Sequence, residues 1–147
     1  MKISIGSDHG GFALKEALIN HLKDENEIID EGCFNTDSVD YPLYAEVVSK
    51  DVVLNKADLG ILICTNGIGM SIAANKFKGI RAALVLNEDM ASHARLHNDA
   101  NILCLGAQNQ TIKDAIKISD IFIKTEFSNV ERHKRRVEEI ESFEGGK

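Results

Sequence analysis

The chain has 147 residues, of which 44% are apolar and 27% charged, a balance typical of a globular protein with one buried core rather than of a disordered chain. Its net charge of −6 argues against broad binding to nucleic acids or to anionic membrane surfaces, since both carry negative charge. No stretch approaches the roughly 18–20 apolar residues of a membrane span, and the first apolar run is too short for a signal peptide.

Short β-type runs alternate with longer amphipathic segments. The first run, 2–6, is followed over 12–22 by apolar residues at helical spacing. A short second strand over 27–30 leads into an irregular polar stretch. After it, Pro42 is expected in the first turn of a helix that runs to about Asn55.

The second half of the chain continues this alternation. Residues 59–64 are almost all apolar, as expected for a parallel strand covered on both faces. The remaining elements are expected, in chain order, as a helix over 68–76, a strand over 81–86, a helix over 88–97, a strand over 101–106, a helix over 111–126, a charged helix over about 130–143 and a frayed tail over 144–147.

Five strands alternating with helices predict an α/β fold of the three-layer, Rossmann-like kind, with a five-stranded parallel sheet and helices on both faces. We expect residues 1–147 to form one domain, because the sequence shows no internal repeat, linker or low-complexity segment. In such folds, ligands bind where strands end and helices begin. The rule selects four strand ends as candidate sites: 6–11, 64–69, 86–89 and 105–110.

The three cysteines form an odd set without C-x-x-C spacing, which indicates neither a disulfide framework nor a zinc site and favours a reducing, cytoplasmic setting. Cys64 ends a strand directly before a helix, where backbone N–H groups and the helix dipole favour a thiolate. Its position alone does not decide whether Cys64 is a reactive thiolate or a small buried side chain of the core. Cys104, flanked by leucines, is expected in the core, and Cys33 stays unassigned.

The turn after Cys64 contains Asn66, Gly67 and Gly69, so its backbone can approach a ligand closely and its N–H groups can face an anion. The same glycines are also compatible with a purely geometric role. The full dinucleotide-binding fingerprint is absent, because Ile72 stands where a third glycine is needed. This disfavours a nucleotide cofactor.

Two pairs of polar residues add candidates. Asp8 and His9 follow the first strand, where Asp8 suits a helix cap and an imidazole can bond sugar hydroxyls or phosphate. His93 and His97 are four residues apart on one helix, but without the glutamate of H-E-x-x-H or a clear third ligand, a metal site is disfavoured. His97 and Asn98 suit proton transfer and hydrogen bonding instead.

The last helix carries a strongly charged run over 131–139, most of which we interpret as a solvated face with oppositely charged pairs. Arg132 and Arg136 are different, because they lie four residues apart on one face and repel each other slightly. Such a pair can form a fork for a phosphate group. A thiol in an anion-favouring turn, two histidines and this fork suit removal of a carbon-bound proton from a small phosphorylated substrate.

Six motifs occur in one order along almost the whole chain: GSDHGGF (6–12), DYP (40–42), GILICTNGIGMSIAANK (60–76), GIRAAL (79–84), HNDANIL (97–103) and RHKRRV (132–137). With them, the chain resembles the sugar-phosphate isomerase family that holds ribose-5-phosphate isomerase B and the galactose-6-phosphate isomerase subunits. The resemblance implies reversible interconversion of ribose 5-phosphate and ribulose 5-phosphate, in the non-oxidative pentose phosphate pathway, without metal or organic cofactor.

The resemblance also implies roles for residues. Cys64 matches the general base that moves a proton between C2 and C1 through a cis-enediolate, with backbone N–H groups over 65–69 binding the oxyanion. His97 matches the residue that helps to open the sugar ring. The family forms dimers or pairs of dimers with shared sites, so His97 and Asn98 are expected to act across an interface. The substrate-binding positions are Asp8, His9, Thr65, Asn66, Gly67, Ile68, Gly69, Asn98, Gln108 and the phosphate ligands Arg132 and Arg136, with Tyr41 nearby.

Two residues depart from the family's pattern. Asn66 stands where a threonine or serine is usual, and Thr65 supplies a hydroxyl one position earlier. The Asn66 amide can donate a hydrogen bond to an oxyanion, but it cannot relay a proton. Gln108 stands where the family often has a phosphate-binding arginine, which predicts weaker phosphate binding or a different sugar length.

Three other functions stay open. A hexose-phosphate isomerase acting on allose or galactose 6-phosphate shares the chemistry, although Cys64 together with His97-Asn98-Asp99 favours the pentose enzyme. A non-catalytic module would use the glycine turn only to bind anions. A cysteine-nucleophile hydrolase would need a histidine beside Cys64 and would form a covalent adduct.

Overall fold

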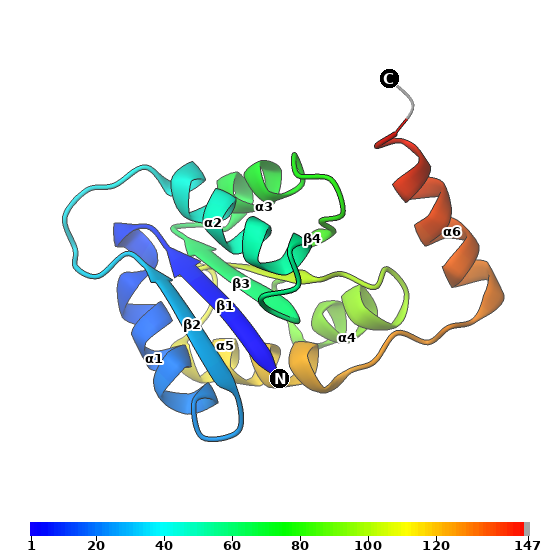
Figure 1. Ribbon diagram of the computed structural model, residues 1–147. Coiled ribbons are helices and arrows are strands. Elements are labelled where there is room, and N and C mark those ends of the chain that lie inside the picture. The colour runs from blue at the N-terminus through cyan, green and yellow to red at the C-terminus, as the bar shows by residue number, and fades with distance from the viewer. Residues whose placement is uncertain (146–147) are drawn as a thin grey trace.

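The computed structural model describes residues 1–145, which form a five-stranded sheet between two layers of helices (Figure 1). The strands pair in the order β2-β1-β3-β5-β4, and every pair is parallel. The predicted fold class is therefore confirmed. The strands are β1 (Lys2–Ser7), β2 (Glu27–Gly32), β3 (Leu59–Cys64), β4 (Ala82–Leu84) and β5 (Ile102–Gly106).

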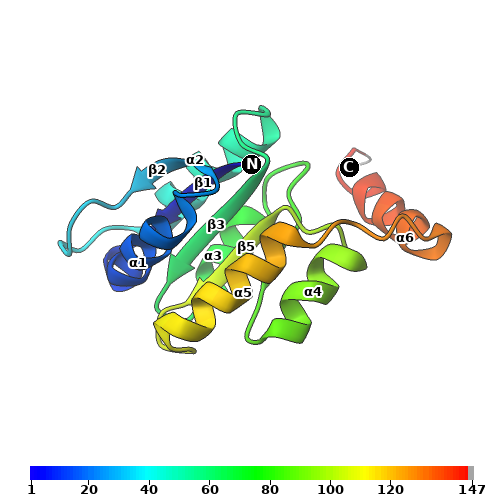
Figure 2. The ribbon, with the colours of Figure 1, turned by 90° about the horizontal axis from the view of Figure 1, so that it is seen from below.

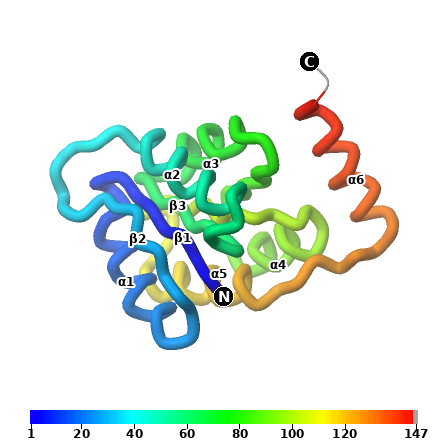
Figure 3. The backbone as a smooth tube through the Cα atoms, in the orientation of Figure 1, coloured from blue at the N-terminus to red at the C-terminus, as the bar shows by residue number. Residues whose placement is uncertain are grey.

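Helices cover both faces of the sheet, as the view from below shows (Figure 2). On one face lie α1 (Phe12–Leu22), α4 (Glu88–Leu96) and α5 (Ile112–Lys124), and on the other α2 (Tyr41–Val53) and α3 (Ile68–Ala74). A 3-10 helix, η1 (His9–Gly11), precedes α1. The last helix, α6 (Glu131–Ser142), stands beside the sandwich at the end of an extended segment (Figure 3). Every helix of the described residues is too short or too polar to cross a membrane.

The expected elements form, with corrections at their ends. The strand expected over 81–86 is only Ala82–Leu84, because β4 is an edge strand and the chain then turns into the cap of α4. The helix expected over 111–126 ends at Lys124, where Thr125 adopts extended backbone angles. The helix expected over 68–76 ends at Ala74. The predicted frayed tail lies partly outside the described residues.

Strand β3 forms the centre of the core. All six of its residues are buried, which confirms the prediction of a strand covered on both faces. Ile61 and Ile63 pack toward α1 and α5, whereas Leu62 and Cys64 pack toward α2 and α3. Each fully buried isoleucine or leucine side chain contributes about 1.5–3 kcal/mol relative to an exposed one, so this strand anchors both layers.

A buried lysine joins α1 to β2. The side chain of Lys15 has no exposed surface, and its Nζ lies 2.8 Å from both Asp30 Oδ1 and Glu16 Oε1. The rings of Phe12 and Phe34 lie 5.5 and 5.6 Å from the same ammonium group. These partners compensate the desolvation of the charge, so that the buried lysine is tolerated.

Two carboxyl groups meet between β2 and α2. Asp51 is buried and accepts a hydrogen bond from the Ser4 hydroxyl at 2.8 Å. The side-chain hydrogen bond with Asp51 raises the pKa of Glu31, and burial and the negative charge of Asp51 raise it further. Because the folded-state pKa of Glu31 lies above its unfolded value, the stabilisation is complete at low pH and is lost as the pH rises through the folded-state pKa.

The substitution Glu31→Gln removes this ionisation and keeps a hydrogen-bonding side chain. We expect the difference in unfolding free energy, variant minus wild type, to become more positive between about pH 4 and pH 7. Urea unfolding at several pH values measures it. Glu138→Gln, on the exposed face of α6, is the control. A difference that stays constant with pH would contradict the assignment.

Candidate active site

Three of the four strand ends selected from the sequence lie side by side at the carboxyl edge of the sheet, the side on which the strands end, because β1, β3 and β5 are neighbours. The helices after β1 and β3 lie on opposite faces, which opens a crevice between the two strand ends. The fourth, 86–89, follows the edge strand and caps α4. A cavity of about 430 Å³ occupies the crevice and is lined by Asp8, Tyr41, Cys64, Thr65, Asn66, Ile68, Gly69 and Ile72.

Cys64 faces this cavity from the end of β3. Its side chain is only 5% exposed, and its Sγ accepts a hydrogen bond from the Gly67 N–H at 3.2 Å. Gly67 has a φ of +80°, a conformation that residues with a side chain rarely adopt. The glycine therefore lets the backbone turn back toward the sulfur, where an N–H donor stabilises a thiolate.

The other two thiols have different surroundings. Cys104 is completely buried, and burial, together with the nearby Cys64, raises its pKa well above the usual range. This confirms its expected place in the core. The Cys33 Sγ donates to the Asn35 carbonyl at 3.3 Å and lies 3.8 Å from the Ser7 hydroxyl. Of the three thiols, Cys64 is the one that lines the cavity.

The turn after Cys64 uses two of its own N–H groups. The Gly67 N–H is engaged by sulfur, and the Ile68 N–H donates to Asn66 Oδ1 at 3.0 Å. These two N–H groups therefore have partners within the turn itself, and the expectation that backbone N–H groups over 65–69 bind an oxyanion stays a prediction. Within the described residues the Nδ2 group of Asn66 makes no hydrogen bond, so this half of the amide is the donor that Asn66 can offer to a ligand.

Asp8 and His9 follow β1, and of the two Asp8 lines the crevice. The Asp8 Oδ1 caps η1 by accepting from the Gly11 N–H at 3.1 Å. His9 is exposed, and its Nδ1 accepts from the Val39 N–H at 3.2 Å. In a neutral ring the proton is then on Nε2, which can donate to a ligand.

Aromatic and polar side chains from α2 and two loops close the crevice. The Tyr41 ring packs on Gly69 so closely that a Cβ there would lie 2.5 Å from ring atoms. The Thr65 hydroxyl lies against Gly10, where a Cβ would come within 2.7 Å of it. Gln108 is exposed in the loop after β5, and its N–H donates to the Thr65 carbonyl at 3.0 Å.

His97 and Asn98 lie at the amino edge of the sheet, the side on which the strands begin. They follow α4, and the backbone carbonyl of Asn98 accepts from Arg81 Nε at 3.2 Å. The nearby Asn101 carbonyl accepts from the N–H of Gly60 at the start of β3. Gly60 and Cys64 are four residues apart along one strand, a rise of roughly 13 Å. Within one chain, His97 and Cys64 are therefore not brought together.

A second group of residues lies around His97, and it includes the predicted Arg132 and Arg136. The His97 ring stacks on His93 with centroids 4.8 Å apart and lies 4.4 Å from the ring of His133 on α6. Burial lowers the pKa of His133, and the charges of His97, Arg132 and Arg136 lower it further. A lowered pKa favours a neutral imidazole, whose Nδ1 lies 2.7 Å from the Ser128 hydroxyl.

Sequence reasoning missed His133, because it lies within a run interpreted mostly as a solvated face. The sequence feature that could have predicted a buried His133 is its four-residue spacing from the apolar Val137, since both are buried on the same face of α6. Arg132 and Arg136 are exposed, as a fork for an incoming anion requires. Within residues 1–145, no group of three or more His, Cys, Asp or Glu side chains is placed to hold a metal ion.

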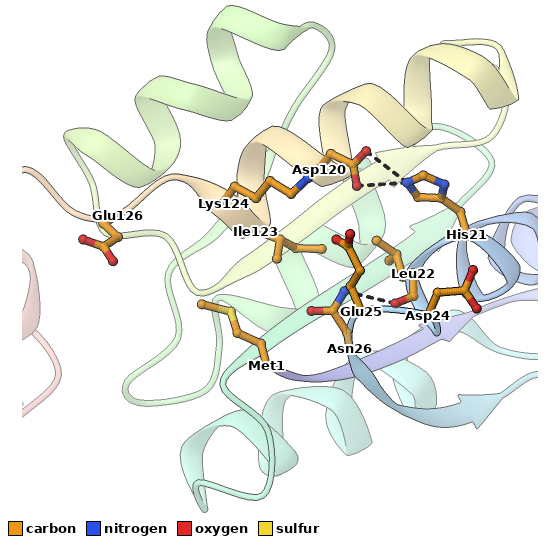
Figure 4. Close-up of a pocket in the computed structure, with 10 residues that line it drawn as sticks. All are labelled: Met1, His21, Leu22, Asp24, Glu25, Asn26, Asp120, Ile123, Lys124 and Glu126. Carbon is orange, nitrogen blue, oxygen red and sulfur yellow. Dashed lines mark hydrogen bonds and ion pairs between the residues drawn. The ribbon is translucent and has the colours of Figure 1, made fainter.

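A cavity of about 510 Å³ lies between the C-terminal ends of α1 and α5 (Figure 4). There His21 Nε2 lies 3.0 Å from both carboxylate oxygens of Asp120. None of the predicted site residues lines it, and Met1 and Asn26 place it at the amino edge of the sheet. The carboxyl edge therefore holds the candidate active site.

Comparison with known proteins gives the class of this protein, which is that of the aldose–ketose isomerases described below, and its α/β fold is the same as theirs. The chain belongs to the ribose/galactose isomerase family, whose model matches residues 3–140.

Relatives match this chain over nearly its whole length. Ribose-5-phosphate isomerase B of Escherichia coli (strain K12) is 41% identical over 144 residues, which cover 97% of this chain and 96% of that protein. The structure of ribose-5-phosphate isomerase B from Clostridium thermocellum is similar with a TM-score of 0.96 and 47% identity, covering 98% of this chain and 97% of that one. The structure of ribose-5-phosphate isomerase B from Mycoplasma genitalium with bound ribulose-5-phosphate gives a TM-score of 0.95 and 43% identity, covering 99% and 97% of the two chains.

Proposed function

We propose that the protein interconverts D-ribose 5-phosphate and D-ribulose 5-phosphate through a cis-enediolate, as a cytoplasmic enzyme of the non-oxidative pentose phosphate pathway. The observation that carries the proposal is the Cys64 sulfur in the crevice with the Gly67 N–H donating to it at 3.2 Å. The relatives support it, because one of them has ribulose-5-phosphate bound. In this proposal residues 1–147 act as one domain and need neither metal nor organic cofactor.

Cys64 is the general base of the proposed reaction. Its thiolate takes the proton from C2 of the open-chain aldose, leaving a cis-enediolate. The thiol then returns the proton to C1 of the enediolate, which gives the ketose. One sulfur can serve both steps because C1 and C2 are bonded neighbours. The Asn66 Nδ2 group donates to the developing oxyanion, and the Thr65 hydroxyl is the nearby group able to relay a proton between the two oxygens.

The remaining roles are shared between two copies of the chain. His97 opens the sugar ring, Asn98 binds the sugar, and Arg132 and Arg136 bind the phosphate of a substrate held on the partner's Cys64. This division follows from the opposite positions of Cys64 and His97 in one chain. The position of α6 beside the sandwich leaves Arg132 and Arg136 exposed to a neighbouring subunit. The functional unit is then a homodimer or a dimer of dimers.

Binding of the sugar falls to the residues on the carboxyl edge. Asp8 and Tyr41 line the cavity together with Ile68 and Gly69, which supports their role in binding the sugar, and His9 and Gly67 are assigned to the same role from their place beside these residues in the chain. Gln108 has no charge to offer a phosphate, which favours a second candidate, a hexose-phosphate isomerase acting on allose 6-phosphate or galactose 6-phosphate.

Steady-state turnover with ribose 5-phosphate, allose 6-phosphate and galactose 6-phosphate separates these two candidates. We expect kcat/KM to be highest for ribose 5-phosphate by roughly tenfold or more, because an ill-fitting extra carbon costs about 1–3 kcal/mol in the transition state. A higher value for either hexose phosphate would favour the second candidate.

The substitution Cys64→Ala tests the proposed base. Turnover should fall roughly 100-fold or more, since a positioned base typically contributes that much, while calorimetry still shows binding of ribose 5-phosphate. Cys33→Ala, at a thiol outside the cavity, is the control and should keep its activity. Unchanged turnover in Cys64→Ala would rule out the mechanism. A wild-type protein that binds ribose 5-phosphate without turning it over would favour the anion-binding module.

Mixing two inactive variants tests the shared site. Cys64→Ala and His97→Ala, unfolded together and refolded, form heterodimers in which one of the two sites has both native groups. We expect recovery of roughly a quarter of the wild-type activity in a random mixture of dimers. Each variant refolded alone is the control. Heterodimers that form without regaining activity would contradict the division of roles.

A further inference from the structure

The loop after β5 holds the turn that follows Cys64. The Ala107 N–H donates to the Cys64 carbonyl at 2.8 Å, and the Gln108 N–H donates to the Thr65 carbonyl at 3.0 Å. The first bond is the last of the parallel pairing of β3 with β5, and the second attaches the turn one residue further along. The backbone of the turn is thus attached to its neighbour at two successive carbonyls.

At the third carbonyl a side chain replaces the backbone donor. The Asn109 N–H turns back to the Gly106 carbonyl at 3.0 Å, so it cannot continue the pairing. Instead, Asn109 Nδ2 donates to the Asn66 carbonyl at 2.9 Å. A Cβ at Gly106 would lie 2.5 Å from the Asn66 carbonyl carbon and closer still to Asn109 Nδ2. The amide nitrogen therefore lies directly against the turn, on an otherwise exposed side chain.

The Asn66 carbonyl and the Gly67 N–H belong to one trans peptide group. Because this group is planar, fixing the direction of its C=O fixes the direction of its N–H, which points the opposite way. The Gly67 N–H is the donor to Cys64 Sγ at 3.2 Å. A peptide group next to a glycine can otherwise rotate easily, since glycine lacks the Cβ that restricts φ.

We infer that Asn109 is a positioning residue for the reactive thiol. Its side-chain amide holds the Asn66–Gly67 peptide group in the orientation that directs the Gly67 N–H at the Cys64 thiolate. Asn109 does not line the cavity and acts through this one peptide group. The consequence for turnover rests on the proposed function, whereas the consequence for the thiol does not.

The test compares Asn109→Leu, which keeps the approximate volume and removes the amide, with wild type. Iodoacetamide alkylation of Cys64 in the folded protein, without substrate, is followed against pH by mass spectrometry. Loss of one hydrogen bond to a charged group predicts roughly tenfold slower alkylation near neutral pH and an upward shift of the profile by about one pH unit. The other ionisable groups around Cys64 are Asp8, Tyr41 and Cys104, and α3 carries none.

Gln110→Leu is the matched control, because it makes the same change one residue along. The buried amide of Gln110 has no hydrogen-bond partner within the described residues, so the alkylation profile should not move. Asn109→Ala also removes the donor without adding a charge, and decides the question if Asn109→Leu does not fold. Urea unfolding establishes which variants are folded at the pH of the assay.

An alkylation profile of folded Asn109→Leu, or of Asn109→Ala, that coincides with wild type would overturn the inference. With ribose 5-phosphate, the variant should lose roughly tenfold in kcat with little change in KM, because the substrate contacts remain. A roughly tenfold rise in KM with unchanged kcat would point to a role in substrate binding and would also overturn the inference. If the wild-type protein proves not to isomerise the sugar, the alkylation result still decides the role of Asn109.

Discussion

The pairing of β3 between β1 and β5 is the constraint on which the rest of the structure depends. It buries all six residues of β3 and joins the two layers of helices through their side chains. It also brings the ends of the three strands to one edge, so that loops distant in sequence can line one cavity. Because the helices after β1 and β3 leave on opposite faces, that edge opens into a crevice instead of being covered.

The same topology separates the predicted site residues into two groups. Cys64 ends a strand, whereas His97 ends a helix that returns along the sheet in the opposite direction. The two residues lie at opposite edges as a direct result. The second group is nevertheless brought together by packing, since His97 contacts His93 and His133, and Arg132 and Arg136 lie near His133. A site shared between subunits reconciles this separation with the chemistry that we propose.

The turn after Cys64 differs from the family's usual sequence and compensates within its own hydrogen bonds. Asn66 uses its amide oxygen to hold the Ile68 N–H, and its carbonyl is held in turn by Asn109. The Thr65 side chain does not take the place of the usual hydroxyl at position 66, because its hydroxyl lies against Gly10. The peptide group that donates to Cys64 is therefore held by hydrogen bonds at both of its polar atoms, one of them from the loop after β5.

Apolar periodicity and strand-end glycines are local signals, and from them alone the fold class, the β3 strand at 59–64 and the strand ends that line the cavity could be predicted. The sequence also placed Cys104 in the core. It did not determine the order β2-β1-β3-β5-β4, the short edge strand β4, the contact between His97 and His133, or the bond from Asn109 to Asn66. These features join segments far apart in the chain, so only tertiary packing, which decides what lies next to what, could select them.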